Sequence, residues 1–405
     1  MTKRIRPSAA IVVAGLLATA TACSGPPASP PGFAGRHPAA AHGANVAEGT
    51  GADGGRAFTL VAAGGILPDT PLIDRAAQDA GGAGFDFRPM LKGVAPTVSQ
   101  ADLAICHMET AYGQQGGPYT GAPSFRSPPE VATALRATGF DSCSTASDHS
   151  LDDGARGIRR TLDALDGAGI AHAGTARSAA EASRPALLRA GKGKDAARVA
   201  HLAYTNGAPG AGKPTGRPWE VAPIDGPRIV ADARKAREAG ADVVVVSLHW
   251  GTEGQDAPDD AQRTLGRRLT SSATGDRPDI DLILGTTHVP QAYEKVNGTW
   301  IAYGSGNQIA GAAVGHDGVP DPRAGEGAMG RFTFAPPAGP GKRWTVRKAE
   351  FLPQWFDPAA GRAVRLSPAT AEAGPGRGDL NRIHDRISRV VLSRGAAQDG
   401  LVEGR

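Results

Sequence analysis

Four short stretches of this chain place His, Glu or Asp directly after apolar runs that predict buried strands. They cover residues 106–109, 147–150, 247–251 and 285–289. In a sheet with helices on its faces, ligands bind at the edge where the strands end. Imidazole and carboxylate groups are also the usual protein ligands of divalent metals. The four stretches therefore predict a single site of metal-ligand composition at one edge of a sheet.

Two of these stretches also have simpler explanations when each is considered alone. Asp148 beside His149 could bind a metal and supply a proton donor, or Asp148 could be a helix N-cap next to a surface histidine. His249 ends the most hydrophobic run of the chain, where a histidine is often just a buried, hydrogen-bonded side chain. Their repeated placement after successive strands favours the site.

The other two stretches supply Glu109 and His288. Glu109 follows the run 102–106, and His107 lies two residues before it, on the same face of a strand. Glu109 could equally be an exposed loop carboxylate. His288 follows the run 281–284 through Gly285, and a glycine permits a sharp turn back over the sheet.

A fifth stretch, residues 63–69, ends the first apolar run and lacks the carboxylate expected at that point. Gly64 and Gly65 occupy the strand end, and the first acidic residue is Asp69. Any claim of catalysis has to account for this gap, for which Asp69 and Asp148 are the candidate substitutes.

The elements that must position these residues alternate between strand and helix patterns. Continuous apolar runs predict strands over residues 58–63, 102–106, 140–145, 199–204, 242–248 and 280–285. Helical spacing predicts helices that begin near residues 130, 158, 229 and 261. This alternation indicates a layered α/β domain. From residue 299 onward, three strand-like segments and a closing helix over 379–393 suggest a second, more antiparallel sheet.

The N-terminus has the features of an export signal. Lys3, Arg4 and Arg6 precede a short apolar stretch over 11–20, and small residues stand directly before Cys23. This pattern predicts a lipoprotein signal peptide over residues 1–22, with Cys23 acylated and holding the protein on the cell membrane outside the cytoplasm. The alternative is ordinary secretion with an incidental cysteine. Residues 23–56 are rich in Gly, Ala and Pro and predict a flexible tether.

Composition sets wider bounds on the class of protein. The 405 residues are 40% apolar and 21% charged, which suits one large globular domain or two medium ones. The net charge of +4 falls by three when the basic residues of the signal are removed, leaving +1. A nearly neutral chain gives no electrostatic reason to expect nucleic-acid binding. Cys106 and Cys143 could form a disulfide in an exported protein, or could be two small buried hydrophobic residues.

The order of these motifs resembles the CapA-type capsule and poly-γ-glutamate synthesis proteins. The shared stretches are residues 100–103, 108–110, 125–130, 137–141, 149–154, 162–165, 169–174, 249–251 and 303–307. That family has the calcineurin-like metallophosphoesterase fold. The resemblance implies an α/β (α+β) fold, a two-sheet β-sandwich flanked by helices, over residues 57–355. Residues 356–405 would then form a C-terminal segment with the closing helix.

Several positions depart from the family's pattern. The Asp that usually follows the first strand is Gly65, the usual Asn before the His is Asp148, and only His288 remains of a closing pair of histidines. The resemblance therefore implies a partly degenerate metal site that holds one divalent metal, Mn, Zn or Fe, or none. It implies His149 as general acid or base. The implied metal ligands are Glu109, Asp148, His249, His288 and Asp69.

The resemblance also implies a role. The chain would be a membrane-tethered protein in the synthesis or export of capsule, poly-γ-glutamate or another anionic cell-surface polymer. Its partners would be the polymer or its synthesis machinery, and it would act by metal-assisted hydrolysis or transfer. The alternative is a non-catalytic binding or assembly component with a decayed site. A solute-binding lipoprotein is disfavoured, because that class shows two similar α/β lobes and the sequence has no such repeat.

Overall fold

The computed structural model describes residues 56–191, 193, 195–207, 216–311, 321–339, 342–367 and 377–405. The expected signal peptide, Cys23 and nearly all of the expected tether lie outside these ranges. Among the described helices, none is long and apolar enough to cross a bilayer.

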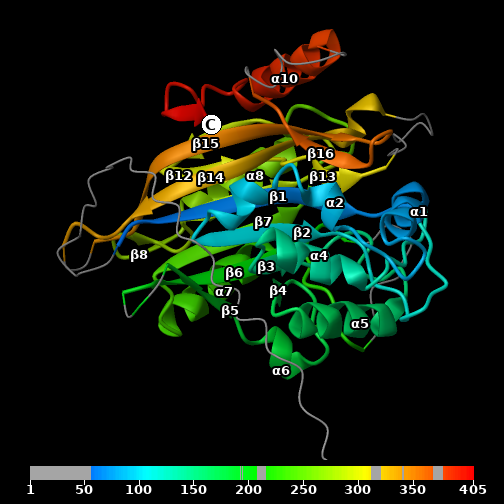
Figure 1. Cartoon of the computed structure of the whole chain (residues 1–405). Helices are drawn as coiled ribbons and strands as arrows, with labels where there is room; N and C mark the ends of the chain where they lie inside the picture. Colours follow the sequence, from blue (N-terminus) through cyan, green and yellow to red (C-terminus); the bar gives the residue numbers. More distant parts are fainter. Residues whose placement is uncertain are drawn as a thin grey trace, which may run out of the picture. The chain divides into compact units, whose positions relative to one another are not determined.

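Two mixed β-sheets form the centre of the described domain (Figure 1). The first sheet has the order β16 (Arg362–Arg365), β15 (Thr345–Asp357), β14 (Glu326–Ala335), β1 (Phe58–Leu67), β2 (Leu103–Met108), β3 (Ser142–Ser144) and β4 (Ala171–Ala173). β13 (Asn307–Ala310) also pairs with β1, and β17 (Leu401–Glu403) pairs with β15. The colours in Figure 1 run from orange to blue across this sheet because late strands lie beside the first one.

The second sheet has the order β11 (Tyr293–Val296), β12 (Thr299–Ala302), β10 (Leu282–Thr286), β7 (Val243–His249), β6 (Ala197–Thr205) and β5 (Ala186–Ala190). A short hairpin, β8 (Ala273–Thr274) and β9 (Arg277–Pro278), stands apart. β1 to β4 run parallel in the first sheet, as do β6, β7, β10 and β12 in the second. Within each sheet these strands therefore end at a common edge.

The valine run of β7 shows how the core is divided. Val243 and Val245 pack with Leu60 and Leu103 of the first sheet, between the two sheets. Val244 and the other alternate side chains point the opposite way, toward the helices. Side chains alternate across a strand, so a strand buried on both faces needs apolar residues at every position.

Helices cover the outer faces of both sheets. On the first sheet they are α1 (Thr70–Asp79), α2 (Arg88–Leu91), α3 (Ala95–Ser99), α4 (Glu130–Thr138) and α5 (Gly154–Gly167). On the second sheet they are α7 (Gly226–Glu238) and α8 (Asp260–Thr270). A short helix, α6 (Ala179–Ala182), precedes β5, and a 3₁₀ turn, η1 (Pro322–Gly325), precedes β14. The two-sheet sandwich flanked by helices confirms the expected fold class.

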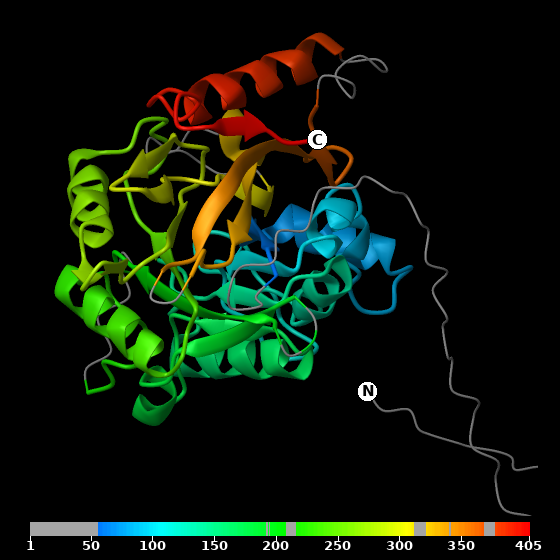
Figure 2. The same ribbon diagram turned by 90° about the vertical axis from the view of Figure 1, so that its left-hand side faces the viewer.

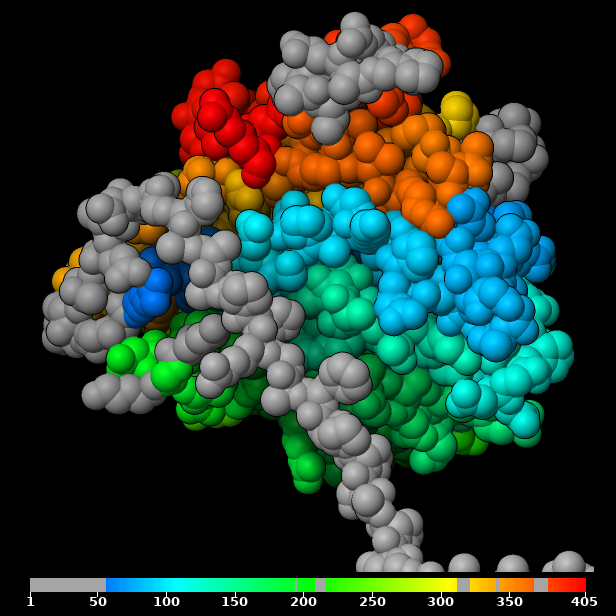
Figure 3. Space-filling model, viewed as in Figure 1, coloured from blue at the N-terminus to red at the C-terminus, as the bar shows by residue number. Residues whose placement is uncertain are grey.

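The C-terminal segment completes the first sheet and the core. Helix α10 (Arg377–Val391) lies beside β17 in Figure 2, and its Ile387 and Val391 join the core between the sheets. Arg386 of α10 donates to Glu326 of β14 at 3.0 Å. In Figure 3 the orange β16 segment lies against the blue α1 segment, where Arg362 donates to Asp79 at 2.8 Å.

The prediction of a second, more antiparallel sheet from residue 299 onward is wrong. β14 and β15 extend the first sheet, because β14 pairs antiparallel with β1 over Phe58–Ala62. β12 instead pairs parallel with β10 in the other sheet. β14 and β15 pair antiparallel and β12 pairs parallel, and these late strands join edges that the early strands leave free.

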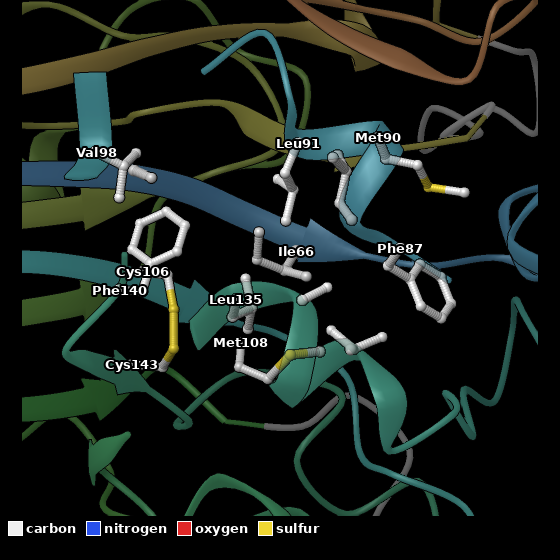
Figure 4. Close-up of a cluster of buried hydrophobic side chains, with 14 of the residues drawn as sticks. Ile66, Phe87, Met90, Leu91, Val98, Cys106, Met108, Leu135, Phe140 and Cys143 are labelled. Atoms are coloured by element: carbon white, nitrogen blue, oxygen red, sulfur yellow. A yellow bond between two sulfur atoms is a disulfide. The ribbon is translucent and has the colours of Figure 1, made fainter. Parts of the chain in front are cut away.

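Cys106 and Cys143 stand opposite each other on the neighbouring strands β2 and β3. Their Cα atoms are 4.5 Å apart and the two side chains form a disulfide. Figure 4 shows the pair within the core under α4, near Phe140. The structure thus favours the disulfide over two free buried cysteines.

Candidate metal centre

The ends of β2, β3, β7 and β10 bring most of the predicted site residues together. His107 lies near the end of β2 and Glu109 follows it directly. Asp148 and His149 lie in the loop after β3. The last residue of β7 is His249, and His288 stands two residues beyond β10. The ring centroids of His249 and His288 are 6.4 Å apart, and those of His107 and His249 are 5.1 Å apart, so the strands of both sheets contribute to one cluster.

His107 joins the two sheets at the centre of this cluster. Its Nδ1 lies 2.6 Å from Ser144 Oγ, and its Nε2 lies 3.1 Å from Nδ1 of His249. Burial, reinforced by the nearby His249, holds the pKa of His107 well below its usual range. His107 is therefore neutral, and in the tautomer whose Nδ1 donates to Ser144, the Nε2 lone pair faces His249 and Glu109.

Glu109 lies between two imidazoles. Its Oε2 is 3.7 Å from Nε2 of His107, and its Oε1 is 3.5 Å from Nε2 of His288. The carboxylate is buried, and burial together with the charge of Asp148 raises the pKa of Glu109 well above its usual range. Burial and the nearby His249 lower the pKa of His288 to about 4. Two imidazole nitrogens and a carboxylate this close together are the groups that bind divalent metals in proteins.

Asp148 connects His249 with His149. Its Oδ1 lies 3.2 Å from Nε2 of His249, and its Oδ2 lies 3.7 Å from Nε2 of His149. Burial alone would raise the pKa of Asp148, but the hydrogen bond and charge of His249 lower it well below the usual range. Asp148 therefore stays ionised.

His149 is oriented from its other side by Asp152. Nδ1 of His149 lies 2.8 Å from Asp152 Oδ2, which also accepts from the Phe125 amide at 2.6 Å. Burial would lower the pKa of His149, but the Asp152 hydrogen bond and the charge of Asp148 raise it. A carboxylate that fixes the ring and favours its protonated form suits a proton donor.

Gly65 and Asn307 form the wall of the cluster on the β1 side. A Cβ atom added at Gly65 would lie 2.6 Å from Glu109 Oε2 and 2.8 Å from Asn307 Oδ1. The Asn307 amide donates to the Ala324 carbonyl at 2.9 Å, which fixes the Oδ1 atom toward Gly65. A side chain at Gly65 would thus point into the cluster and crowd Glu109 and Asn307.

The residues present fit a divalent cation. His107, Glu109 and His249 each offer a ligand atom, and these atoms lie within 4.8 Å of one another. Three buried polar atoms around them make no hydrogen bond within the described residues: Glu109 Oε1, His288 Nδ1 and Asn307 Oδ1. Buried polar atoms are normally paired, and a bound cation would satisfy the oxygens.

The family follows from a direct comparison with known families. The model described as bacterial capsule synthesis protein PGA_cap matches residues 59–312, more than half of the chain. The chain belongs to this family. The PGA biosynthesis protein CapA of Bacillus subtilis is 29% identical over 182 residues, which are 44% of this chain and 45% of that protein.

Two further relatives match this PGA_cap chain, one at lower identity than CapA and one over a shorter stretch. A probable polyglutamine synthesis accessory protein of Mycobacterium tuberculosis is 27% identical over 221 residues, which are 51% of this chain and 55% of that protein. An uncharacterized protein of Sinorhizobium fredii is 32% identical over 149 residues, which are 36% and 31% of the two chains. The chain thus matches between 31% and 55% of the length of these three relatives.

Solved structures with a similar trace are more distant in sequence. The calcineurin-like phosphoesterase YfkN of Bacillus subtilis is 12% identical with a TM-score of 0.41, covering 82% of this chain and 97% of that one. The NAD nucleotidase NadN of Haemophilus influenzae is 10% identical with a TM-score of 0.41, covering 82% and 62%.

Asp69 has a different place in this PGA_cap structure. It is the N-cap of α1, and its Oδ1 accepts from the Leu72 amide at 3.3 Å. Burial raises its pKa to about 6. None of the contacts found among the described residues joins Asp69 to the histidine cluster, so its assignment as a metal ligand remains a prediction.

Sequence reasoning did not assign His107 or Asn307 to the site. His107 was recognisable, because it shares a strand face with Glu109, two residues on. Asn307 begins β13, which reaches the site only by pairing beside Gly65. No local pattern reveals that pairing.

Proposed function

We propose that this chain is an exported, lipid-anchored PGA_cap protein that acts in the synthesis or export of an anionic cell-surface polymer. Its family is described as capsule synthesis, and a relative carries the name PGA biosynthesis protein. The basic n-region and short apolar segment before Cys23 support export and lipidation. Such an anchor would keep the domain at the membrane surface where a polymer emerges.

We further propose that the cluster of His107, Glu109 and His249 holds one divalent metal, Mn, Zn or Fe. When bound, such an ion polarises a phosphoryl or acyl oxygen and acidifies water. The chain's own contribution is proton transfer. The raised pKa of His149, fixed by Asp152 at 2.8 Å, keeps a proton at Nε2 for a leaving group.

The observation that carries this proposal is the convergence of His107, Glu109 and His249 around the buried Glu109 Oε1, which makes no hydrogen bond within the described residues. Elemental analysis and calorimetric titration with Mn²⁺ and Zn²⁺ test it on the exported chain. The expected result is one ion bound per chain. His249→Ala should weaken binding at least roughly tenfold, as loss of a directly bound ligand does. The control is His172→Ala. His172 lies outside the cluster, where its Nε2 is 3.2 Å from Asp166 Oδ1, so this substitution should leave metal binding unchanged.

A second function, a non-catalytic binding or assembly component, is favoured by two positions at the cluster that lack a metal-binding side chain. Gly65 offers no carboxylate, and Thr286, two residues before His288, places a hydroxyl 3.5 Å from Nδ1 of His249. A two-metal mechanism needs ligands for both ions. A phosphodiester assay with Mn²⁺ separates the two functions. Hydrolysis that His149→Asn abolishes supports catalysis, and metal binding without hydrolysis supports the assembly role.

A further inference from the structure

A buried histidine outside the ligand set, His201 of β6, connects the two sheets close to the metal centre. Its side chain is fully buried. Its Nδ1 lies 2.8 Å from Ser142 Oγ on β3, and its Nε2 lies 2.9 Å from Ser247 Oγ on β7. Both ring nitrogens are therefore occupied, and the imidazole spans the space between the first sheet and the second.

The alternation of β6 explains why His201 points between the sheets. His201 stands opposite Val245 of β7, and residues that face each other on neighbouring strands share a side of the sheet. Val245 and Val199, two residues before His201 on β6, both pack in the core between the sheets. A histidine thus takes a position at which this alternation favours an apolar side chain.

The imidazole of His201 is neutral, because burial lowers its pKa to about 3. A neutral imidazole has one N–H donor and one acceptor nitrogen. In either tautomer one serine hydroxyl donates to the ring and the other accepts from it, so both ring nitrogens are satisfied. Buried polar groups are costly when unpaired, so these contacts favour one arrangement of β3, β6 and β7.

The two strands that His201 connects also carry contacts of the metal centre. Ser144, two residues after Ser142 on β3, lies 2.6 Å from Nδ1 of His107. His249, two residues after Ser247 on β7, lies 3.1 Å from Nε2 of His107. Residues two apart on a strand share a face and are separated by roughly 7 Å. Two imidazoles, one after the other along the strands, thus link β3 to β7.

We propose that His201 is a positioning residue for the metal centre, which fixes β3 against β7 and thereby the contact between His107 and His249. These strands cannot separate or slide without breaking a hydrogen bond to Ser142 or Ser247. Ligands must be held within about 0.5 Å of their productive places, so a small displacement matters. The inference rests on the proposed metal site and names the residue that keeps two of its ligands together.

Stability alone is the alternative role of such a buried network, and a second contact between the sheets separates the two roles. Tyr293 of β11 is fully buried in the same core and donates to the Ala328 carbonyl of β14 at 2.9 Å. None of its contacts found among the described residues involves the histidine cluster. Tyr293→Phe therefore removes a bond between the sheets without acting on β3 or β7.

Nitrogen-15 NMR of the histidine side chains, measured on the full chain in EDTA, tests the proposal without metal. The ring signals report the tautomers and hydrogen bonds of His107 and His249. His201→Leu removes both polar nitrogens and should shift these signals. His201→Gln keeps a donor and an acceptor and should return them toward the values of the unmodified chain. Tyr293→Phe should leave them in place while lowering the Tm.

Calorimetric titration with Mn²⁺ measures the consequence for the metal site. His201→Leu should weaken Mn²⁺ binding about tenfold, which is the loss typical of removing a group that orients metal ligands. His201→Gln should recover most of this affinity. Tyr293→Phe should bind Mn²⁺ like the unmodified chain.

Ser142→Ala keeps the proposal testable if His201→Leu does not fold, because it removes one hydroxyl and leaves the imidazole in place. It should shift the ring signals of His107 and His249 as well. Unchanged ring signals or unchanged Mn²⁺ affinity in a folded variant of this pair would overturn the positioning role.

Equal effects of Tyr293→Phe would assign the changes to a general loosening of the sheets and would also overturn the role of His201. An unmodified chain that binds no Mn²⁺ would instead contradict the proposed metal site. The ring signals, measured without metal, decide the role of His201 in that case too.

Discussion

Gly65 lies against the Glu109 carboxylate, since a Cβ atom added at Gly65 would come 2.6 Å from Glu109 Oε2. The backbone of Gly65 is outside the left-handed region, so a side chain there is not excluded by its φ angle. The crowding atoms, Glu109 Oε2 and Asn307 Oδ1, are the ends of buried side chains and must shift to admit a side chain at position 65. A carboxylate at position 65 would thus enter the cluster only with a shift of these two side chains.

Gly65→Asp should increase the affinity for Mn²⁺ by about tenfold, because a second hard oxygen ligand joins Glu109. Without metal the same variant should be less stable, since two buried carboxylates would then face each other. Calorimetric titration and thermal unfolding with and without Mn²⁺ measure both effects. Gly65→Asn, of equal shape but uncharged, should give neither the affinity gain nor the metal-dependent rescue. An Asp variant that binds metal no better than the Asn variant would show that position 65 does not face the ion.

Thr286→His, combined with Gly65→Asp, should raise the binding stoichiometry from one ion toward two. The Thr286 hydroxyl already lies 3.5 Å from Nδ1 of His249, so an imidazole there would stand beside an existing ligand. Metal content of the purified double variant tests this. Thr287→His is the control, because the Thr287 hydroxyl donates to the Val289 carbonyl and not toward His249. A stoichiometry that stays at one would mean that further ligands are absent.

Much of this fold was predictable because buried strands and helices have recognisable patterns of apolar residues in the sequence. The valine run of β7 predicted a central strand, since both of its faces are covered. Glu109 and His249 were predictable as site residues because each follows such a run. Pairing between distant segments was not predictable. Neither β14 beside β1 nor Asn307 beside Gly65 leaves a signal in its own residues.

Opening the Cys106–Cys143 disulfide should lower the free energy of unfolding by about 2 to 4 kcal/mol, since the bridge restricts a loop in the unfolded chain. The two residues are 37 apart in sequence and both are fully buried. Opening the bridge therefore exposes neither sulfur to water in the folded chain, and no gain in solvation offsets the lost stability. Urea unfolding of the unmodified chain and of Cys106→Ala/Cys143→Ala measures it. The reductant dithiothreitol should destabilise the unmodified chain only. Equal sensitivity of both proteins to reductant would contradict a structural role for the bridge.

Cys23→Ser should move the protein from the membrane fraction to the soluble exported fraction. The prediction follows from the small residues before Cys23 and the short apolar segment at 11–20, which is too short to anchor a protein by itself. Metabolic labelling with a fatty acid and fractionation test it, and Ser24→Ala is the matched control. Retention of Cys23→Ser in the membrane fraction, with no lipid label on the unmodified chain, would exclude the anchor.

Asp69→Asn separates helix capping from metal binding. Burial raises the pKa of Asp69 from 3.8 to about 6, so the folded chain holds this proton more tightly than the unfolded chain. The stability due to Asp69 is therefore complete below about pH 4 and is lost as the pH rises through about 6. Asparagine keeps the cap on the Leu72 amide without the buried charge. The variant should be more stable near neutral pH by on the order of 1 to 2 kcal/mol, with the difference vanishing at about pH 4.

Urea unfolding of Asp69→Asn at several pH values, with metal removed, measures this difference. Asp225→Asn provides the control, because Asp225 caps α7 through the Arg228 amide at 2.9 Å but is exposed. Its stability change should be small and nearly independent of pH, since an exposed carboxylate loses little hydration on folding. If Asp69→Asn instead reduced the bound metal per chain, Asp69 would be a ligand that reaches the cluster. The carboxylate missing at Gly65 would then have a substitute four residues later.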